Sequence, residues 1–365
     1  MPTPFDVLQR YYDQNRFVDL VRDADGIYWL KLRSISRSEQ LRRFCQFIGL
    51  DCDRISGRQL LAYVYDHRPP VVLLEHFIRW LYREARAERE AHEDELISQL
   101  YQMRAFDWGG LYQNSLEQTI VDHYVKRIRS WNELNSAIDS ELHDSLRSYV
   151  QCSWYNHWSS VIIQDIFNDH PSVLPVIGLV KKVDFFIHDF PFDLKVTYFP
   201  DGYLQLLRRR EGLRPELAEL KTFCRSANIW FDNSTPPSTL FMELIAKIAE
   251  HPSDNARDFI TEFRATRLRL IQQTIQDPTD LKVWLYENQG VRRFDASNRF
   301  FLILVDLKHV EDSWKLKRNK VLLVEDINNH LNAMRPDVME SLKLSFKWRD
   351  ETFEAYSDIL FVLAD

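Results

Sequence analysis

Two aspartates and a lysine near the middle of the chain are of the types that metal-dependent hydrolysis of a phosphate ester requires. Asp193 and Lys195 alternate with apolar residues in the run Phe192–Phe199, and Asp184 interrupts an apolar run shortly before it. Carboxylates bind Mg²⁺, the metal lowers the pKa of a bound water, and a lysine can position or deprotonate that water. The alternative is a strand with one solvated polar face and a cross-strand charge pair.

The spacing of polar and apolar residues predicts the strands that must position this group. Strict alternation in the second run places Asp193 and Lys195 on one face of a strand. The preceding strand is expected at Val183–Ile187, with His188–Pro191 as the turn of a hairpin. Such a hairpin brings Asp184 alongside the strand that carries the other two residues.

An acidic residue two positions before a lysine occurs four times in the chain, so context must select the functional triplet. Glu219-Leu220-Lys221 lies in a predicted helix, where positions two apart face different directions. Asp280-Leu281-Lys282 opens another predicted helix, where Asp is an ordinary capping residue. Asp306-Leu307-Lys308 is the real competitor, but it ends a strand, and Lys308 is expected to point to solvent.

The hydrophobic pattern along the chain divides it into two regions. Residues 1–150 show helical periodicity and are expected to form a region for target recognition or dimerisation, whereas residues 151–365 form the proposed catalytic core. In the core we expect the strands Val176–Val180, Val183–Ile187, Phe192–Phe199, Arg299–Asp306, Leu342–Trp348, Thr352–Tyr356 and Asp358–Leu363. Helices between these strands indicate a mixed α/β core with helices on both faces. A purely helical protein with a peripheral sheet is the weaker alternative.

The segment Val183-Asp184-Phe185 with Phe192-Asp193-Leu194-Lys195 resembles the PD-(D/E)xK nuclease superfamily, which includes type II restriction endonucleases. The resemblance implies a restriction-endonuclease-like mixed central sheet flanked by helices. It also implies Mg²⁺ as the cofactor, with Mn²⁺ as a substitute. Asp184, Asp193 and the main-chain carbonyl of Leu194 would hold the metal, and Lys195 would activate water.

The resemblance also implies a carboxylate on the helix that precedes the first strand. The chain has Gln164 at this position, with Asp165 next to it and rotated by about 100° around the helix. Gln164 is therefore the candidate for the fourth catalytic position, where its amide brings no charge. Val183 also replaces the proline that usually precedes the first acid of the motif.

Basic residues in the core are candidates for contact with nucleic-acid phosphates, although such runs are usually solvated surface. They are Lys181, Lys182, Arg208, Arg209, Arg210, Arg292, Arg293, Lys315, Lys317, Arg318 and Lys320. Of these, Arg208, Arg209, Arg210, Lys315, Lys317 and Arg318 are the strongest candidates. The charged run Arg83–Glu95 is instead typical of a solvated helix face held by i,i+4 pairs.

Composition limits the remaining possibilities. The net charge of −7 is unusual for a general nucleic-acid binder, so local clusters of basic residues must supply any affinity. The four cysteines have no spacing typical of a zinc site or a disulfide framework. Because the first residues are polar and no apolar run reaches about 18 residues, we expect a cytoplasmic protein with no membrane segment.

The sequence therefore predicts a Mg²⁺-dependent endonuclease that hydrolyses DNA, with a restriction or phage-defence role taken from the resemblance and with homodimerisation as one use of the helical region. The alternative is a protein that keeps the nuclease fold but has lost turnover and acts as a nucleic-acid-binding or assembly module. Gln164 and the acidic net charge both permit this alternative.

Overall fold

The structure is a computed structural model that describes residues 2–106, 120–235, 237–288 and 297–364. The chain forms two compact units. Unit 1 comprises Met1–Phe192 and Lys317–Met334, and unit 2 comprises Asp193–Leu316 and Arg335–Asp365.

Unit 1 begins with short helices that pack around one aromatic core. These helices are α1 (Phe5–Asp13), α2 (Phe17–Arg22), α3 (Gly26–Arg33), α4 (Ser38–Ile48), α5 (Leu60–Asp66) and α6 (Val71–Glu90), and α7 (Glu93–Leu100) follows them. Trp29, Phe44 and Phe77 are almost completely buried in the core that they share. Burial of these rings supplies much of the hydrophobic stabilisation of the N-terminal region.

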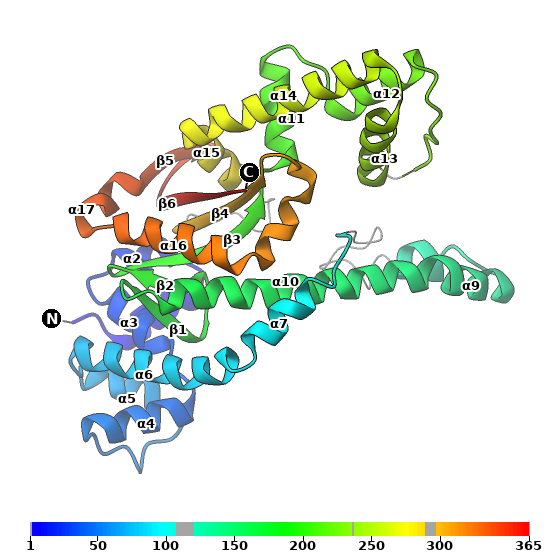
Figure 1. Ribbon diagram of the computed structural model, residues 1–365. Helices are drawn as coiled ribbons and strands as arrows, with labels where there is room; N and C mark the ends of the chain where they lie inside the picture. The colour runs from blue at the N-terminus through cyan, green and yellow to red at the C-terminus, as the bar shows by residue number, and fades with distance from the viewer. Residues whose placement is uncertain (1, 107–119, 236, 289–296, 365) are drawn as a thin grey trace. The chain divides into compact units, whose positions relative to one another are not determined.

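The rest of unit 1 contains a long helix and a strand hairpin. The π-helical turns Val121–Val125 and Ile138–Leu142 flank α9 (Trp131–Ala137), and α10 (His143–Asp169) leads into β1 (Val173–Val180) and β2 (Val183–Ile187). A later segment, α16 (Lys320–Ala333), packs against α10, as Figure 1 shows. Leu174, Val183 and Phe186 complete the core formed by the N-terminal helices.

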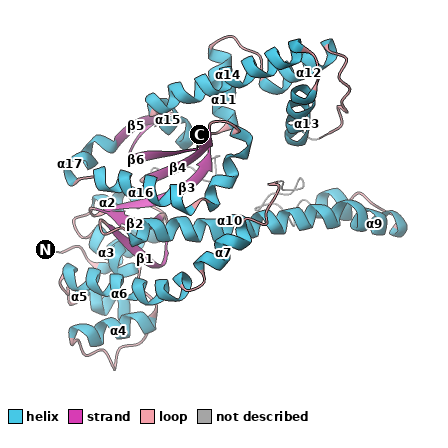
Figure 2. Cartoon of the chain, viewed as in Figure 1, coloured by secondary structure: helices cyan, strands magenta, loops and turns pink. Residues whose placement is uncertain are grey.

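Unit 2 contains the parallel part of the sheet and a helical insertion. Its strands are the second part of β3 (Phe190–Tyr198), β4 (Arg299–Asp306), β5 (Lys343–Trp348) and β6 (Glu351–Ala364). Its helices are α11 (Asp201–Arg210), α12 (Glu216–Ser226), α13 (Pro237–Glu250), α14 (Asp254–Gln276), α15 (Thr279–Glu287), α17 (Pro336–Met339), the 3₁₀ segment Val310–Arg318, which ends in unit 1, and the 3₁₀ turn Glu340–Leu342. Helices α12 to α14 share a core of their own (Figure 2).

The strands are hydrogen-bonded in the order β1-β2-β3-β4-β6-β5. The β1–β2, β2–β3 and β5–β6 pairs are antiparallel, and the β3–β4 and β4–β6 pairs are parallel. The chain is therefore a mixed α/β protein with a six-stranded mixed sheet and a mainly helical N-terminal region, as predicted. Since β4 is buried along nearly its whole length, the sheet is not peripheral.

The boundary between the units differs from the one expected at residue 150. Strand β3 belongs to both units, because Phe190–Phe192 pair with β2 and Asp193–Tyr198 pair with β4. The first hairpin joins unit 1 because its apolar side chains enter the core of the N-terminal helices. Helical periodicity alone could not show this long-range packing.

The prediction of two separate strands at the end of the chain was wrong. The last two predicted strands form the single strand β6, which pairs first with β5 and, from Ser357 onwards, with β4. The predicted break fell at Ser357, but Ser357 and its neighbour Asp358 are polar residues that are both buried within this strand. Helix α11 begins at Asp201, and a Cβ on Gly202 would lie 2.9 Å from the Trp284 ring.

Candidate functional site

The hairpin that carries the two candidate aspartates has a two-residue turn. Ile187 pairs with Phe190 and Phe185 pairs with Phe192, so His188 and Asp189 alone connect the strands, and both have positive φ. Asp189 forms an ion pair with Lys31, a buried lysine of α3, which ties the turn to the N-terminal helices.

The register of this hairpin shows which residues of the two strands stand next to the aspartates. Asp184 is bonded directly to Phe185, Asp193 is bonded directly to Phe192, and those two phenylalanines are partners in the antiparallel ladder. The predicted strand Val183–Ile187 is therefore confirmed with its bounds unchanged. The turn is shorter than expected because Phe190 and Pro191 belong to the second strand.

Asp193 and Lys195 lie on the same face of β3, as the alternation predicted. Lys195 Nζ is 2.7 Å from Asp193 Oδ1, and the side chain of Lys195 is 40% exposed whereas that of Asp193 is 15% exposed. The Asp193 amide donates a hydrogen bond to the Asn298 carbonyl before β4. Because backbone groups alternate in direction along a strand, the carbonyl of Leu194 points to the edge of β3 away from β4.

In unit 1, Asp184 and Gln164 line the same pocket, which has a volume of about 280 Å³. Gln164 comes from α10 and Asp184 from β2, so a helix and a strand meet around this space. Arg37, which directly precedes α4, lines the pocket as well. The structure therefore brings Gln164 and Asp184 together, and it adds an arginine that the sequence analysis had not selected.

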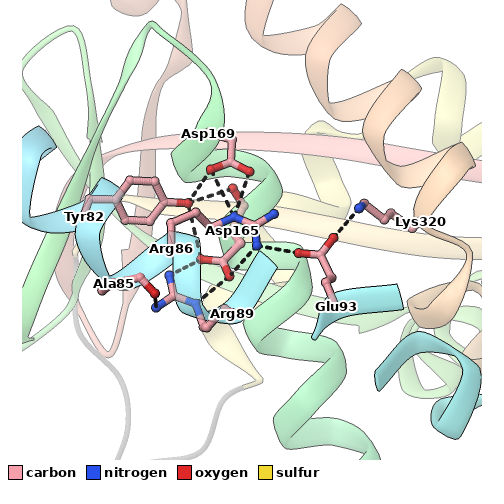
Figure 3. Close-up of polar contacts among 8 residues, drawn as sticks. All are labelled: Tyr82, Ala85, Arg86, Arg89, Glu93, Asp165, Asp169 and Lys320. Atoms are coloured by element: carbon pink, nitrogen blue, oxygen red, sulfur yellow. Dashed lines mark hydrogen bonds and ion pairs between the residues drawn. The ribbon is translucent and has the colours of Figure 1, made fainter. Parts of the chain in front are cut away.

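Asp165, the neighbour of Gln164, takes part in a different interaction. Its side chain is only 6% exposed and accepts two hydrogen bonds from Arg89, at 2.8 Å from Nε and 2.7 Å from Nη2 (Figure 3). Such a bidentate pair fixes the rotation of α10 relative to α6. Gln164, about 100° around the helix, is the residue that reaches the pocket.

Arg86 is the centre of this buried ion-pair cluster, which joins α6, α7, α10 and α16 (Figure 3). Its guanidinium lies 2.6 Å from Glu93 and 3.1 Å from Asp169. Glu93 also pairs with Lys320. Burial alone would raise the pKa of the Glu93 carboxyl, but the hydrogen bonds from Lys320 and Arg86 outweigh burial and hold this pKa below its ordinary value.

The expectation that Arg83–Glu95 forms a solvated helix face was therefore wrong for Arg86 and Glu93. Arg86 and Glu93 are both more than 90% buried, and their partners come from other helices rather than from positions i+4. The sequence does contain a signal, since Arg86 follows Leu74, Ile78 and Tyr82 at intervals of four on the apolar stripe of α6.

The six strongest phosphate-contact candidates divide into buried and exposed groups. Arg208 is buried and pairs with Glu219, Lys317 is buried against Asn156, and Arg318 is buried with hydrogen bonds to main-chain carbonyls. These contacts give the three residues structural roles. Arg209, Arg210 and Lys315 lie at or near the surface, although Arg210 pairs with Asp280 and Lys315 with Asp312. Arg292 and Arg293 lie outside the described residues.

Burial of Lys317 gives a testable pH dependence. Burial lowers the pKa of this ammonium from its ordinary value of 10.5 to about 8. Between these two values the unfolded chain binds more protons at this position, so the free energy of unfolding rises with pH. We expect Lys317→Met to flatten that rise in urea-unfolding measurements between about pH 8 and pH 10. An equally steep rise in the variant would contradict this assignment.

The competing triplet at Asp306 has a local structural role. Asp306 Oδ1 accepts hydrogen bonds from the amides of Lys308 and His309, at 3.0 and 2.8 Å. Lys308 is exposed, as expected, so its ammonium does not follow the face of β4. The triplets at Glu219 and Asp280 lie in α12 and α15, also as expected.

The donor atoms at the candidate site suit a hard cation such as Mg²⁺. In unit 1, Asp184 carries a carboxylate and Gln164 an amide carbonyl, and in unit 2, Asp193 carries a carboxylate and Leu194 a main-chain carbonyl. Such oxygen atoms are the ligands that Mg²⁺ prefers. Within the described ranges, no group of three or more His, Cys, Asp or Glu side chains could hold a metal ion. The four cysteines are buried and form no disulfide bond within the described residues.

Two further observations bear on the class of protein. In the part of the chain that the structure describes, no helix is both long and apolar enough to cross a membrane. No family model matches the chain, and no curated protein or solved structure does so either.

Proposed function

We propose that this chain is a Mg²⁺-dependent endonuclease that hydrolyses phosphodiester bonds in DNA, in a restriction or phage-defence role. The observation that supports the proposal most strongly is the β2–β3 register, which pairs Phe185 with Phe192 and leaves an aspartate next to each of them in the chain. The mixed six-stranded sheet, with Asp184 on β2 and with Asp193 and Lys195 on β3, is compatible with the mixed central sheet that the PD-(D/E)xK resemblance implies.

The proposed roles follow from the chemistry of each side chain. Asp184 and Asp193 would hold the cation, with oxygen donors from Leu194 and Gln164. A bound Mg²⁺ would supply Lewis acidity and neutralise charge on the phosphate. Lys195, whose ammonium is partly exposed and lies beside Asp193, would orient the attacking water by donating a hydrogen bond to it.

A binding or assembly protein without turnover is the second candidate. The ammonium of Lys195 already pairs with Asp193 at 2.7 Å, and the pocket beside Asp184 contains the neutral Gln164 instead of a third carboxylate. Both features would weaken metal binding relative to a site with three acids. This candidate predicts binding of nucleic acid without cleavage.

Cleavage of mixed plasmid and phage DNA by the purified chain, with and without Mg²⁺, tests the proposal. We expect Mg²⁺-dependent cutting by the wild type and its loss in Lys195→Ala. The exposed Lys308→Ala, in the competing triplet, is the matched control and should cut normally. Failure of the wild type to cut with either Mg²⁺ or Mn²⁺ would favour the binding protein.

A further inference from the structure

The pocket beside Asp184 lies wholly within unit 1 and combines a cation, an amide, a carboxylate and apolar surface. It is lined by Arg37, Gln164, Val176, Ile177, Gly178, Leu179, Val180, Val183 and Asp184. Its polar side chains come from three separate segments, and a bulge in β1 forms its apolar wall. The space therefore has the mixture of charge and apolar surface that a nucleotide unit requires.

A close backbone approach places Arg37 at this pocket. The β1–β2 register shifts between Pro175 and Val180, and within that bulge the Gly178 amide donates a 2.7 Å hydrogen bond to the Ser34 carbonyl. A Cβ on Gly178 would lie 2.8 Å from the same oxygen, so glycine permits the approach. The contact holds the bulge against the segment that follows α3, and Arg37 is three residues farther along that segment.

The Arg37 guanidinium is available to an incoming anion. Its side chain is exposed and makes no hydrogen bond or ion pair with another described residue. Arg68 and Arg86 of the same unit, by contrast, are paired with carboxylates. An arginine that lines a pocket and has no ion pair with another described residue is suited to two parallel hydrogen bonds with a phosphate.

Leu179 adds an exposed apolar side chain to the pocket. Its side chain is 94% exposed, the highest fraction among the large exposed apolar residues of the described chain, and it lines the same space. An apolar side chain beside a phosphate-binding cation can contact the face of a sugar or a base. Lys181 and Lys182, two and three residues later, keep the surroundings basic.

We infer that this pocket binds one nucleotide of the nucleic-acid strand, with its phosphate on Arg37 and its sugar or base against Leu179. The inference rests on the proposed function, because it treats Asp184 as a neighbour of the substrate phosphate. It assigns to the N-terminal helical region a direct contact with the substrate next to the candidate metal site.

The charges in the pocket give the inference a distinctive consequence. The negative charge of Asp184 disfavours a phosphate in this pocket, whereas the positive charge of Arg37 favours it. Asp184→Asn should therefore strengthen binding when divalent cations are absent, and Arg37→Ala should weaken it. A divalent cation should strengthen binding by the wild type and have little effect on Asp184→Asn.

Fluorescence anisotropy with fluorescein-labelled single-stranded and duplex oligonucleotides measures these changes, with Ca²⁺ in place of Mg²⁺. We expect Arg37→Ala to raise the Kd about tenfold and to reduce the slope of log Kd against log salt by about one. Arg37→Lys should restore the slope but only part of the affinity, because lysine lacks the bidentate geometry. Arg83→Ala, an exposed arginine on α6 outside the pocket, should change neither quantity.

Leu179→Ala separates the apolar contact from the charge contact. This variant should weaken binding and leave the salt slope unchanged, since no charge is removed. Val72→Ala, which truncates an exposed apolar residue of α6, is its control and should bind like the wild type. Because both side chains are exposed, thermal unfolding should not distinguish these variants from the wild type.

The outcomes separate this inference from the proposed function. Cleavage that continues with unchanged affinity in Arg37→Ala would overturn the inference and keep the nuclease. Binding that depends on Arg37 without cleavage in any metal would keep the inference and overturn the nuclease. Wild-type binding that is absent, or that inorganic phosphate displaces as well as the unlabelled oligonucleotide does, would overturn the nucleotide site.

Discussion

Arg86→Met will lower the free energy of unfolding by about 3 to 5 kcal/mol at neutral pH, which is the usual cost of removing one partner from a buried ion-pair cluster. The Arg86 side chain is only 10% exposed, and three carboxylates lie within 4 Å of its guanidinium. Methionine fills a similar volume without charge. It would leave Glu93 with Lys320 as its remaining cation and Asp169 without its arginine partner.

Urea unfolding followed by tryptophan fluorescence measures this effect. Arg83→Met on the same helix is the matched control, because Arg83 is exposed and should change the stability by less than about 0.5 kcal/mol. Similar midpoints for the two variants would show that the cluster contributes no more than ordinary surface charge.

Acid titration gives an independent check on the same cluster. The pKa of Glu93 is held below its ordinary value of 4.5, so the stability that it contributes is fully present above pH 4.5 and is lost as the pH falls through the lowered pKa. In Arg86→Met this pKa should move upward, because one of the two cations beside the carboxylate is gone. The loss of stability in acid that Glu93 contributes should then be smaller than in the wild type and should be complete at a higher pH.

Asp184→Asn and Asp193→Asn will each lower the rate of DNA cleavage about a thousandfold, a change of about 4 kcal/mol in the activation free energy. The proposal gives both carboxylates one task, holding a single cation. The double variant should therefore be little worse than either single variant, since residues that act as a unit are not additive. Two aspartates with separate tasks would instead give losses that multiply.

Asp306→Asn is the control for this experiment, since Asp306 heads the competing triplet and its carboxylate accepts hydrogen bonds from two backbone amides at a turn. An asparagine oxygen can still accept those hydrogen bonds, so cleavage should be unchanged. Loss of cleavage in this variant together with normal cleavage in Asp193→Asn would transfer the catalytic assignment to the end of β4.

The sequence predicted best those features that depend on neighbouring residues. Strand β2 and strand β4 have the bounds that their apolar runs indicated. The shared face of Asp193 and Lys195 follows from the two-residue period of a strand and needs no tertiary information. Gln164 was selected through the family resemblance rather than from a local pattern, and it lines the same pocket as Asp184.

Features that depend on distant contacts could not be obtained in this way. Arg37 faces the pocket because Gly178, far along the chain, bonds to Ser34, and no local pattern contains that contact. In the sequence, Arg86 and Glu93 have the pattern of surface charges. In the structure they are buried because they pair with residues of α10 and α16. Likewise, Asp358 is buried within β6 just after the position where the partner of that strand changes from β5 to β4.

The helical insertion between β3 and β4 affects the order in which the chain can fold. Asp193 pairs with Arg299, which is more than a hundred residues later, so the parallel pair closes a long loop and should form late. At a synthesis rate of about 5 to 20 residues per second, roughly 5 to 20 seconds separate the emergence of the two strands from the ribosome. Helices α12 to α14 can bury their own core during this interval, which shortens the disordered part of the loop before β4 arrives.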